Sequence, residues 1–252
     1  MFYQPARNLL QQRIIMVTGA GDGIGREAAL TYARYGASVI LLGRTAAKLN
    51  AVRSRIADEG GAQARVVVMD LLQAADEDYR RLGEELLAQV PRLDGLLNNA
   101  GLLGEVAPMA RQSADSWRQV MAVNVNGTFL LTQAMLPLLL KASRPSLVFS
   151  TSSVGHRGRA NWGAYAVSKF ATEGMMQVLA DEYPVGTLRV NSVNPGGTRT
   201  AMRRRAFPDE DPNRLPTPAD IMPIYLYLMG DDSHRKTGIC FDAQPGRKPG
   251  PA

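Results

Sequence analysis

A tyrosine and a lysine lie four residues apart in the segment YAVSKF, at Tyr165 and Lys169. The apolar spacing around them, over residues 161–183, predicts a helix, which would place both side chains on one face. An ammonium group beside a phenol favours the phenolate and so lowers the pKa of the tyrosine, which is about 10 in a free side chain. The pair could therefore exchange a proton with a substrate oxygen. Because the chain has eight tyrosines, this spacing needs support from other residues.

The elements that would position this pair follow an alternating pattern. Short, nearly continuous apolar runs are each followed by an amphipathic stretch, which is typical of parallel strands covered by helices. The pattern predicts the α/β class and one domain over residues 1–252: a single Rossmann-type doubly wound parallel sheet of about seven strands, with helices on both faces. Strands are expected at residues 13–19, 37–43, 64–70, 94–99, 146–152, 188–195 and 238–243, and helices at residues 23–36, 45–61, 76–90, 114–142 and 161–183, with Gly36 and Gly60 at helix ends.

A glycine-rich turn, VTGAGDGIGREAAL, joins the first predicted strand to the first predicted helix. Its glycines allow a tight turn and a close approach to a pyrophosphate, and the helix start behind them offers N–H groups and a positive dipole. Strand, turn and helix in this order are the context that a dinucleotide site requires. The residues expected to contact the dinucleotide here are Gly19, Gly21, Asp22, Gly23, Ile24 and Gly25.

The end of the second predicted strand, LLGRT, bears on the choice between NAD and NADP. Sites that prefer NAD carry an acidic residue there, which hydrogen-bonds the ribose 2′-hydroxyl. Gly43 takes that place and Arg44 follows it, so a 2′-phosphate would meet a cation and no carboxylate. This predicts NADP as the cofactor, with NAD as the alternative. Two points stay open: Arg44 could be an exposed helix-cap residue, and Asp22 adds negative charge near the phosphates.

The composition narrows the class of protein. The net charge is +6, but no recognition-helix or aromatic stacking pattern predicts specific nucleic-acid binding. The single cysteine, Cys240, excludes an intramolecular disulfide and a cysteine-based metal cluster, and with two histidines no histidine-rich metal site is expected. The sequence shows no charged leader and no apolar run of about 18 residues, so we expect a cytoplasmic protein with no metal and no membrane partner.

Residues 203–223 form a long stretch without clear periodicity that is rich in proline and charge. Such segments inside compact domains are often lids or binding loops, and this one follows the carboxyl end of a strand, where open α/β sheets bind ligands. We therefore expect a substrate lid, with a plain surface loop as the alternative. Its three successive arginines, Arg203, Arg204 and Arg205, could bind an anionic substrate such as a phosphopantetheine or a carboxylate, or could form a solvated helix face.

Further motifs stand in a definite order along the chain. TGAGDGIG is followed by NNAG at residues 98–101, by Y-x3-K with Ser152 thirteen residues ahead of Tyr165, and by NPGGTRT at residues 194–200. In this order and spacing, over residues 13–242, the chain resembles the short-chain dehydrogenase/reductase family in its common short form. Within the family, NPGGTRTAMR and FDAQPGRKPG are similar to segments of a group of uncharacterised bacterial oxidoreductases in the oxoacyl-carrier-protein-reductase-like branch.

The resemblance implies a catalytic set of four residues. In the family, the tyrosine matched by Tyr165 passes a proton to or from the substrate oxygen, and the lysine matched by Lys169 also holds the nicotinamide ribose. Ser152 would orient the carbonyl, and Asn124, in AVNVNGTF, would hold a water that extends the proton relay.

Neighbouring residues leave alternatives open. Ser150 or Ser153 could act in place of the predicted catalytic serine, and Asn126 in place of the predicted asparagine. The asparagine could also simply bond to the backbone of a kinked helix. His156 and Trp162, in VGHRGRANWG, could line the substrate pocket, or the tryptophan could be core and the histidine exposed.

The resemblance also implies further cofactor contacts, although an aspartate after a strand could equally be a helix cap. The residues implied are Asp70 and Leu71 at the adenine edge, Asn99 and Gly101 by the adenosine ribose, and Pro195, Gly196, Thr198 and Thr200 along the nicotinamide and its phosphates.

The implied function is an NADP(H)-dependent oxidoreductase that interconverts a carbonyl and a secondary alcohol on a small molecule, with 3-oxoacyl compounds as candidate substrates. The alternative is a non-catalytic dinucleotide-binding regulator or redox sensor. The family also implies a homodimer or homotetramer, built through the helices at residues 114–142 and 162–183. The ending FDAQPGRKPGPA departs from the VDGG-like ending of the family, which leaves the C-terminal contacts open.

Overall fold

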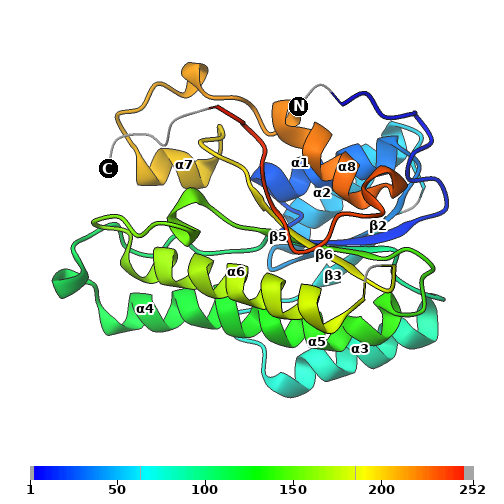
Figure 1. Cartoon of the computed structure of the whole chain (residues 1–252), viewed down its shortest axis with the longest axis horizontal. Helices are drawn as coiled ribbons and strands as arrows, with labels where there is room; N and C mark the ends of the chain where they lie inside the picture. Colours follow the sequence, from blue (N-terminus) through cyan, green and yellow to red (C-terminus); the bar gives the residue numbers. More distant parts are fainter. Residues whose placement is uncertain (1–2, 63, 185, 247–252) are drawn as a thin grey trace.

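The central sheet has seven parallel strands in the order β3-β2-β1-β4-β5-β6-β7 (Figure 1). We describe it from a computed structural model, in which residues 3–62, 64–184 and 186–246 are described. The order runs outward from β1 in one direction and from β4 in the other, so the predicted doubly wound Rossmann-type sheet is confirmed. The strands are β1 (Ile14–Thr18), β2 (Ser38–Gly43), β3 (Arg65–Val68), β4 (Gly95–Asn98), β5 (Ser146–Ser150), β6 (Arg189–Asn194) and β7 (Cys240–Asp242).

Helices cover both faces of the sheet, and each face has its own apolar core between the sheet and the helices (Figure 1). The helices α1, α2 and α8 pack on one face around residues such as Tyr32, and α3, α5 and α6 pack on the other around Phe149. Gly36 and Gly60 follow α1 and α2 with φ values of 99° and 78°, the left-handed values that end a helix. The bounds are α1 (Gly23–Arg34), α2 (Ala46–Asp58), α3 (Asp76–Gln89), α4 (Ala114–Met121), α5 (Thr128–Leu139), α6 (Gly163–Glu182), α7 (Ala201–Ala206) and α8 (Met222–Met229).

The helical region predicted at residues 114–142 contains a change of helix type. A π-helical turn, η2 (Ala122–Gly127), joins α4 to α5 without a break in the helical path. Such turns are rare and occur mostly at functional sites. The residue predicted for the proton relay, Asn124, lies in this turn and is 2% exposed.

Residues 203–223 are more regular than the sequence predicts. They begin within α7, which is capped by the Thr200 hydroxyl accepting the Arg203 amide at 3.1 Å. Two 3₁₀ turns, Pro212–Arg214 and Ala219–Ile221, then lead into α8. The sequence missed α8 because its residues, MPIYLYLM, are apolar all round, so they lack the 3.6-residue periodicity of a half-exposed helix.

The continuous helical run Ala114–Leu139 is long and apolar enough, by length and composition, to cross a membrane. The sequence expectation considered only unbroken apolar runs, which this helix lacks because Asn124, Asn126 and Gln133 interrupt it, and so it passed over this helix. Half of the apolar window is buried against the rest of the fold, and the core helices of soluble proteins meet the same criterion.

Candidate active site

A cavity of about 490 Å³ lies at the carboxyl ends of the strands, where the strand order reverses between β1 and β4. This is the place where open α/β sheets bind ligands. All the predicted cofactor residues except Gly25 line it: Gly19, Gly21, Asp22, Gly23, Ile24, Arg44, Asp70, Leu71, Asn99, Gly101, Tyr165, Lys169, Pro195, Gly196, Thr198 and Thr200.

The glycine turn is fastened to the loop after β4 at this reversal point. The Thr18 hydroxyl accepts the main-chain amides of Asn99 and Ala100, both at 2.9 Å. Gly19 has a φ of 65°, which favours glycine. Gly25 lies behind the turn, where an added Cβ would come within 2.4 Å of the Gly19 carbonyl oxygen. Gly25, which the sequence predicts as a dinucleotide contact, therefore packs behind the turn and does not line the cavity.

The negative charge of Asp22 is balanced by a lysine that the sequence did not single out. The Lys48 ammonium donates to the Asp22 carboxylate at 2.6 Å, and this bond is the main cause that lowers the pKa of Asp22. The other carboxylate oxygen accepts the Gly23 amide at 2.8 Å and so caps α1. Lys48 and Arg44 both line the cavity, which makes this part of its wall cationic.

Asp70 caps a turn and not a helix, and its contact with the adenine stays a prediction. Its carboxylate accepts the Leu72 amide at 3.0 Å, as a turn-capping aspartate does, and it also lines the cavity.

Tyr165 and Lys169 project from α6 into the cavity together with Ser152, which follows β5. The Lys169 Nζ lies 5.5 Å from the centre of the Tyr165 ring and donates to the Ser150 main-chain carbonyl at 2.7 Å. The Ser152 side chain hydrogen-bonds Tyr165. The three predicted groups therefore meet at one point of the cavity wall.

The pKa of Tyr165 shifts in the direction opposite to the sequence expectation. Burial of the phenol raises its pKa to about 12, and the hydrogen bond with Ser152, which favours the phenolate, offsets this in part. Burial also lowers the pKa of Lys169 to about 8, against an opposing contribution from Glu173. The expectation failed because it counted the neighbouring charge and not the desolvation of both groups. At neutral pH the site holds a neutral phenol beside an ammonium group.

The serines and asparagines that the sequence could not tell apart have different surroundings. Ser150 lines the cavity, but its hydroxyl donates to the Asn99 side chain at 3.3 Å. Ser153 begins a 3₁₀ turn and does not line the cavity. Ser152 is therefore the serine that hydrogen-bonds Tyr165. Asn126 is exposed, whereas Asn124 is buried.

The side chain of Asn124 is engaged by its own neighbours. It accepts the Leu102 amide at 2.7 Å and donates to the Leu102 carbonyl at 2.9 Å and to the Ser168 hydroxyl at 3.0 Å. Ser168 in turn donates to the Tyr165 carbonyl at 2.7 Å. The side chain thus connects the π-helical turn to the loop after β4 and to α6. These bonds correspond to the alternative in which the asparagine bonds to the main chain. The sequence did not single out Ser168, although it lies between Tyr165 and Lys169.

The wall opposite the sheet is formed by α7 and an aromatic group. Trp162 lines the cavity, with its ring 5.6 Å from Tyr165 and 5.8 Å from Phe207. Of the three arginines, Arg203 and Arg205 line the cavity. Arg203 pairs with Glu210 at 2.6 Å, and Arg205 donates to the Gly104 carbonyl at 3.3 Å.

The C-terminal segment supports the loop at residues 195–198 as far as the structure describes it. The Gln244 side chain donates to the Pro195 and Gly197 carbonyls at 2.8 and 3.1 Å. The rest of the unusual ending, residues 247–252, lies outside the described residues.

Comparison with known proteins agrees with this arrangement. Residues 13–211 match the family model of short chain dehydrogenases. The oxidoreductase YciK of Escherichia coli K12 is 66% identical over 250 residues, 99% of each chain, which bears out the narrower resemblance. A 3-oxoacyl-[acyl-carrier-protein] reductase of Aquifex aeolicus is 31% identical, over 91% of this chain and 94% of its own. A short chain dehydrogenase structure from Escherichia coli CFT073, complexed with NADPH, has a TM-score of 0.94 and 66% identity, covering 96% of this chain and 100% of its own. The chain therefore belongs to the short chain dehydrogenase family of oxidoreductases.

Proposed function

We propose that the protein is an NADP(H)-dependent oxidoreductase that interconverts a carbonyl and a secondary alcohol. The observation that supports this most is the meeting of Ser152, Tyr165 and Lys169 in the cavity that the glycine turn also lines. Burying an ammonium group beside a phenol is costly, and proton transfer to a substrate would use both groups, whereas dinucleotide binding alone would use only the lysine. The test is consumption of NADPH by the purified protein in the presence of a panel of carbonyl compounds.

The residues of the cavity fit a dinucleotide. Gly19 and Gly23, with φ values of 65° and 53°, bring the main chain to the cavity where α1 begins, and a helix start attracts phosphate. Arg44 supplies a cation for a 2′-phosphate, with Lys48, which is paired with Asp22, beside it. When bound, the cofactor would supply or accept the hydride.

The catalytic residues divide the remaining tasks. In carbonyl reduction the Tyr165 hydroxyl would donate its proton to the substrate oxygen, and Ser152 would orient that oxygen. The Lys169 ammonium would stabilise the phenolate that Tyr165 becomes. A relay water at Asn124 would have to be held by the main chain, because the side-chain amide already bonds Leu102 and Ser168.

Replacing Arg44 by alanine is expected to weaken NADPH binding about 10- to 100-fold and to leave NADH binding unchanged. A charge-assisted hydrogen bond to a phosphate is worth about 1.5 to 3 kcal/mol, and NADH lacks that phosphate. Quenching of tryptophan fluorescence measures both affinities, since Trp162 lines the cavity. Arg53→Ala, on the exposed side of α2, is the matched control. An equal loss for both cofactors would contradict the proposed 2′-phosphate contact.

The rate of carbonyl reduction is expected to fall as the pH rises through about 8. Tyr165, with a pKa of about 12, keeps its proton throughout the neutral range, whereas Lys169, with a pKa of about 8, loses its charge there. The neutral amine no longer stabilises the phenolate, so kcat/KM should be flat below this pH and decrease above it. Alcohol oxidation, which needs a proton acceptor, should gain from alkaline pH. A reduction rate that climbs through pH 8 would exclude this assignment.

We also propose a substrate class for the same cavity. Apolar side chains, among them Leu103, Val123 and Met202, share the wall with Arg205. Among the described residues, no carboxylate is recorded as a hydrogen-bond or ion-pair partner of Arg205, so its charge is available to a ligand. This combination suits an acyl chain on an anionic carrier, in agreement with the 3-oxoacyl reductase among the relatives.

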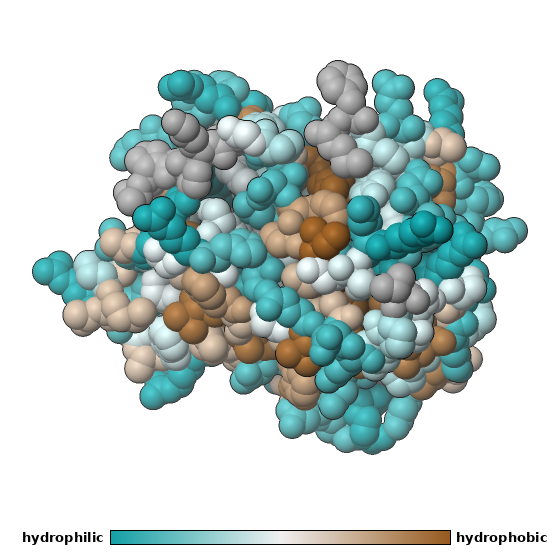
Figure 2. Space-filling view, viewed as in Figure 1, coloured by the Kyte–Doolittle hydropathy of each residue, from teal (hydrophilic) through white to brown (hydrophobic). Residues whose placement is uncertain are grey.

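A subunit interface is proposed on α6. Val167, Phe170 and Val178 are exposed by 38%, 45% and 56%, and their spacing puts them on one face of the helix together with Gly174. Figure 2 shows apolar side chains gathered on the side of the molecule where α5 and α6 lie. Light scattering should give two or four times the chain mass of 27.3 kDa, and Phe170→Glu with Val178→Glu should give the monomer. A monomeric wild-type protein would exclude the interface.

A further inference from the structure

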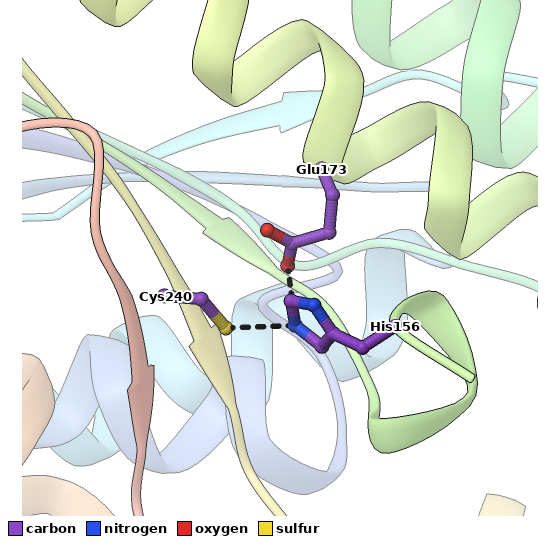
Figure 3. Close-up of side chains that lie close together, drawn as sticks. All are labelled: His156, Glu173 and Cys240. Carbon is purple, nitrogen blue, oxygen red and sulfur yellow. Dashed lines mark hydrogen bonds and ion pairs between the residues drawn. The ribbon is translucent and has the colours of Figure 1, made fainter.

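Three side chains with metal-ligating atoms converge outside the cavity, on elements far apart in the sequence (Figure 3). His156 lies in the loop after β5, Glu173 on α6 and Cys240 at the start of β7. None of the three lines the dinucleotide cavity, and none has a role in the proposed reaction. One ligand atom from each lies within 4.8 Å of the other two.

Two of the three distances between these atoms lie near the edges of a tetrahedron around one ion, with the nitrogen–sulfur distance a little shorter than the ideal edge. The His156 Nε2 is 3.2 Å from the Cys240 Sγ and 3.5 Å from a Glu173 carboxylate oxygen. Zinc bonds of about 2.0–2.1 Å to nitrogen and oxygen and about 2.3 Å to sulfur imply ligand separations of about 3.4–3.6 Å. Nitrogen, sulfur and oxygen are also the ligand atoms that Zn²⁺ prefers.

A hydrogen-bonded triad explains the arrangement less well. In such a triad the acid binds one ring nitrogen of the histidine and the nucleophile binds the other. Here the sulfur and the carboxylate face the same nitrogen, Nε2, which carries at most one proton. A cation at the centre would bond all three atoms at once.

The surroundings are those of a half-open metal site. The side chain of Glu173 is 5% exposed, and the Ser192 hydroxyl donates to its two carboxylate oxygens at 2.9 and 3.1 Å. Hydrogen bonds of this kind orient ligating carboxylates. The side chain of His156 is 48% exposed, which leaves an entry path for the ion and a side for a water ligand.

We propose that His156, Glu173 and Cys240 bind one Zn²⁺ ion, with water as the fourth ligand. Cys240 binds as the thiolate and releases its proton to solvent, so that thiolate and carboxylate balance the charge of the ion. The ion joins β7, the edge strand of three residues, to α6 and to the loop after β5. Its role is structural, and it does not depend on the proposed redox function.

The test is Co²⁺ binding to the full chain, purified without a histidine tag and stripped of metal. We expect one equivalent of Co²⁺ to bind with the visible bands of a tetrahedral site and a thiolate-to-cobalt charge-transfer band, and one equivalent of Zn²⁺ to displace it. Cys240→Ser should abolish the charge-transfer band, and His156→Gln should weaken Zn²⁺ binding at least about 10-fold. His234→Gln, which changes the other histidine of the chain, should leave both unchanged.

Thermal unfolding gives a second readout, independent of activity. Saturating Zn²⁺ should raise the Tm of the wild type by about 5 °C and leave the Tm of Cys240→Ser unchanged. Circular dichroism and NADPH titration would verify that each variant is folded. Absence of stoichiometric binding, or binding that survives both Cys240→Ser and His156→Gln, would overturn the proposal.

Discussion

Replacing Tyr165 by phenylalanine should lower kcat for carbonyl reduction between about one-hundredfold and ten-thousandfold, the usual contribution of a positioned proton donor. The substitution removes the hydroxyl that bonds Ser152 and keeps the ring packed 5.6 Å from Trp162. The affinity for NADPH should therefore change little. Single-turnover reduction of a carbonyl substrate, followed by the loss of NADPH absorbance, measures the effect.

The matched control is Tyr183→Phe, which makes the same change at the far end of α6. It should retain the wild-type rate. A Tyr165→Phe protein with more than a tenth of the wild-type rate would show that another group supplies the proton. An unchanged NADPH affinity together with a lost rate would separate the chemical step from cofactor binding.

The second large effect is expected for Gly25→Ala, which should weaken dinucleotide binding by about two orders of magnitude. The new Cβ would lie 2.4 Å from the Gly19 carbonyl oxygen and 2.5 Å from the Asn99 side-chain nitrogen, so the turn must move. Each charge-assisted hydrogen bond to the phosphates that is lost costs about 1.5–3 kcal/mol, so the loss of one or two of them accounts for about 100-fold. The crowding should lower the free energy of unfolding by about 1 to 3 kcal/mol, too little to unfold the domain.

Gly158→Ala is the control for this substitution, because nothing lies within 4 Å of its added Cβ in the loop after β5. It should leave NADPH affinity unchanged and change the free energy of unfolding by less than about 1 kcal/mol. Calorimetric titration with NADPH, beside thermal unfolding by circular dichroism, measures both quantities. A Gly25→Ala protein that binds NADPH normally would show that the turn can relax without losing the site.

The element order could be predicted because the signals that carry it are local. Seven apolar runs gave the seven strands of the sheet, and Gly36 and Gly60 ended two helices because glycine adopts a left-handed φ without strain. The helical features that the sequence did not predict lack such a local signal. The helix α8 is apolar on every side and shows no period, and the π-helical turn around Asn124 has no pattern of its own.

The sequence predicted most of the residues that line the cavity, but it did not predict their pKa shifts or their charge pairing. Motif spacing placed Tyr165 and Lys169 on one face of α6, but it could not show that burial raises one pKa to about 12 and lowers the other to about 8. Nor could it show that Lys48 neutralises Asp22. Desolvation and pairing depend on which elements pack together, and that information is not local.

The sequence by itself determined the strands, most of the helices, the glycine turn and the spacing of the predicted catalytic residues, since each depends on neighbours a few positions away. The tertiary structure decided which of several identical side chains bonds Tyr165, as with Ser152 among three serines. It also brought together His156, Glu173 and Cys240, although one cysteine and two histidines had argued against a metal site. These three residues lie on three separate elements, so no sequence spacing indicates that they are neighbours. The packing of those elements on the sheet sets the distances between the three side chains.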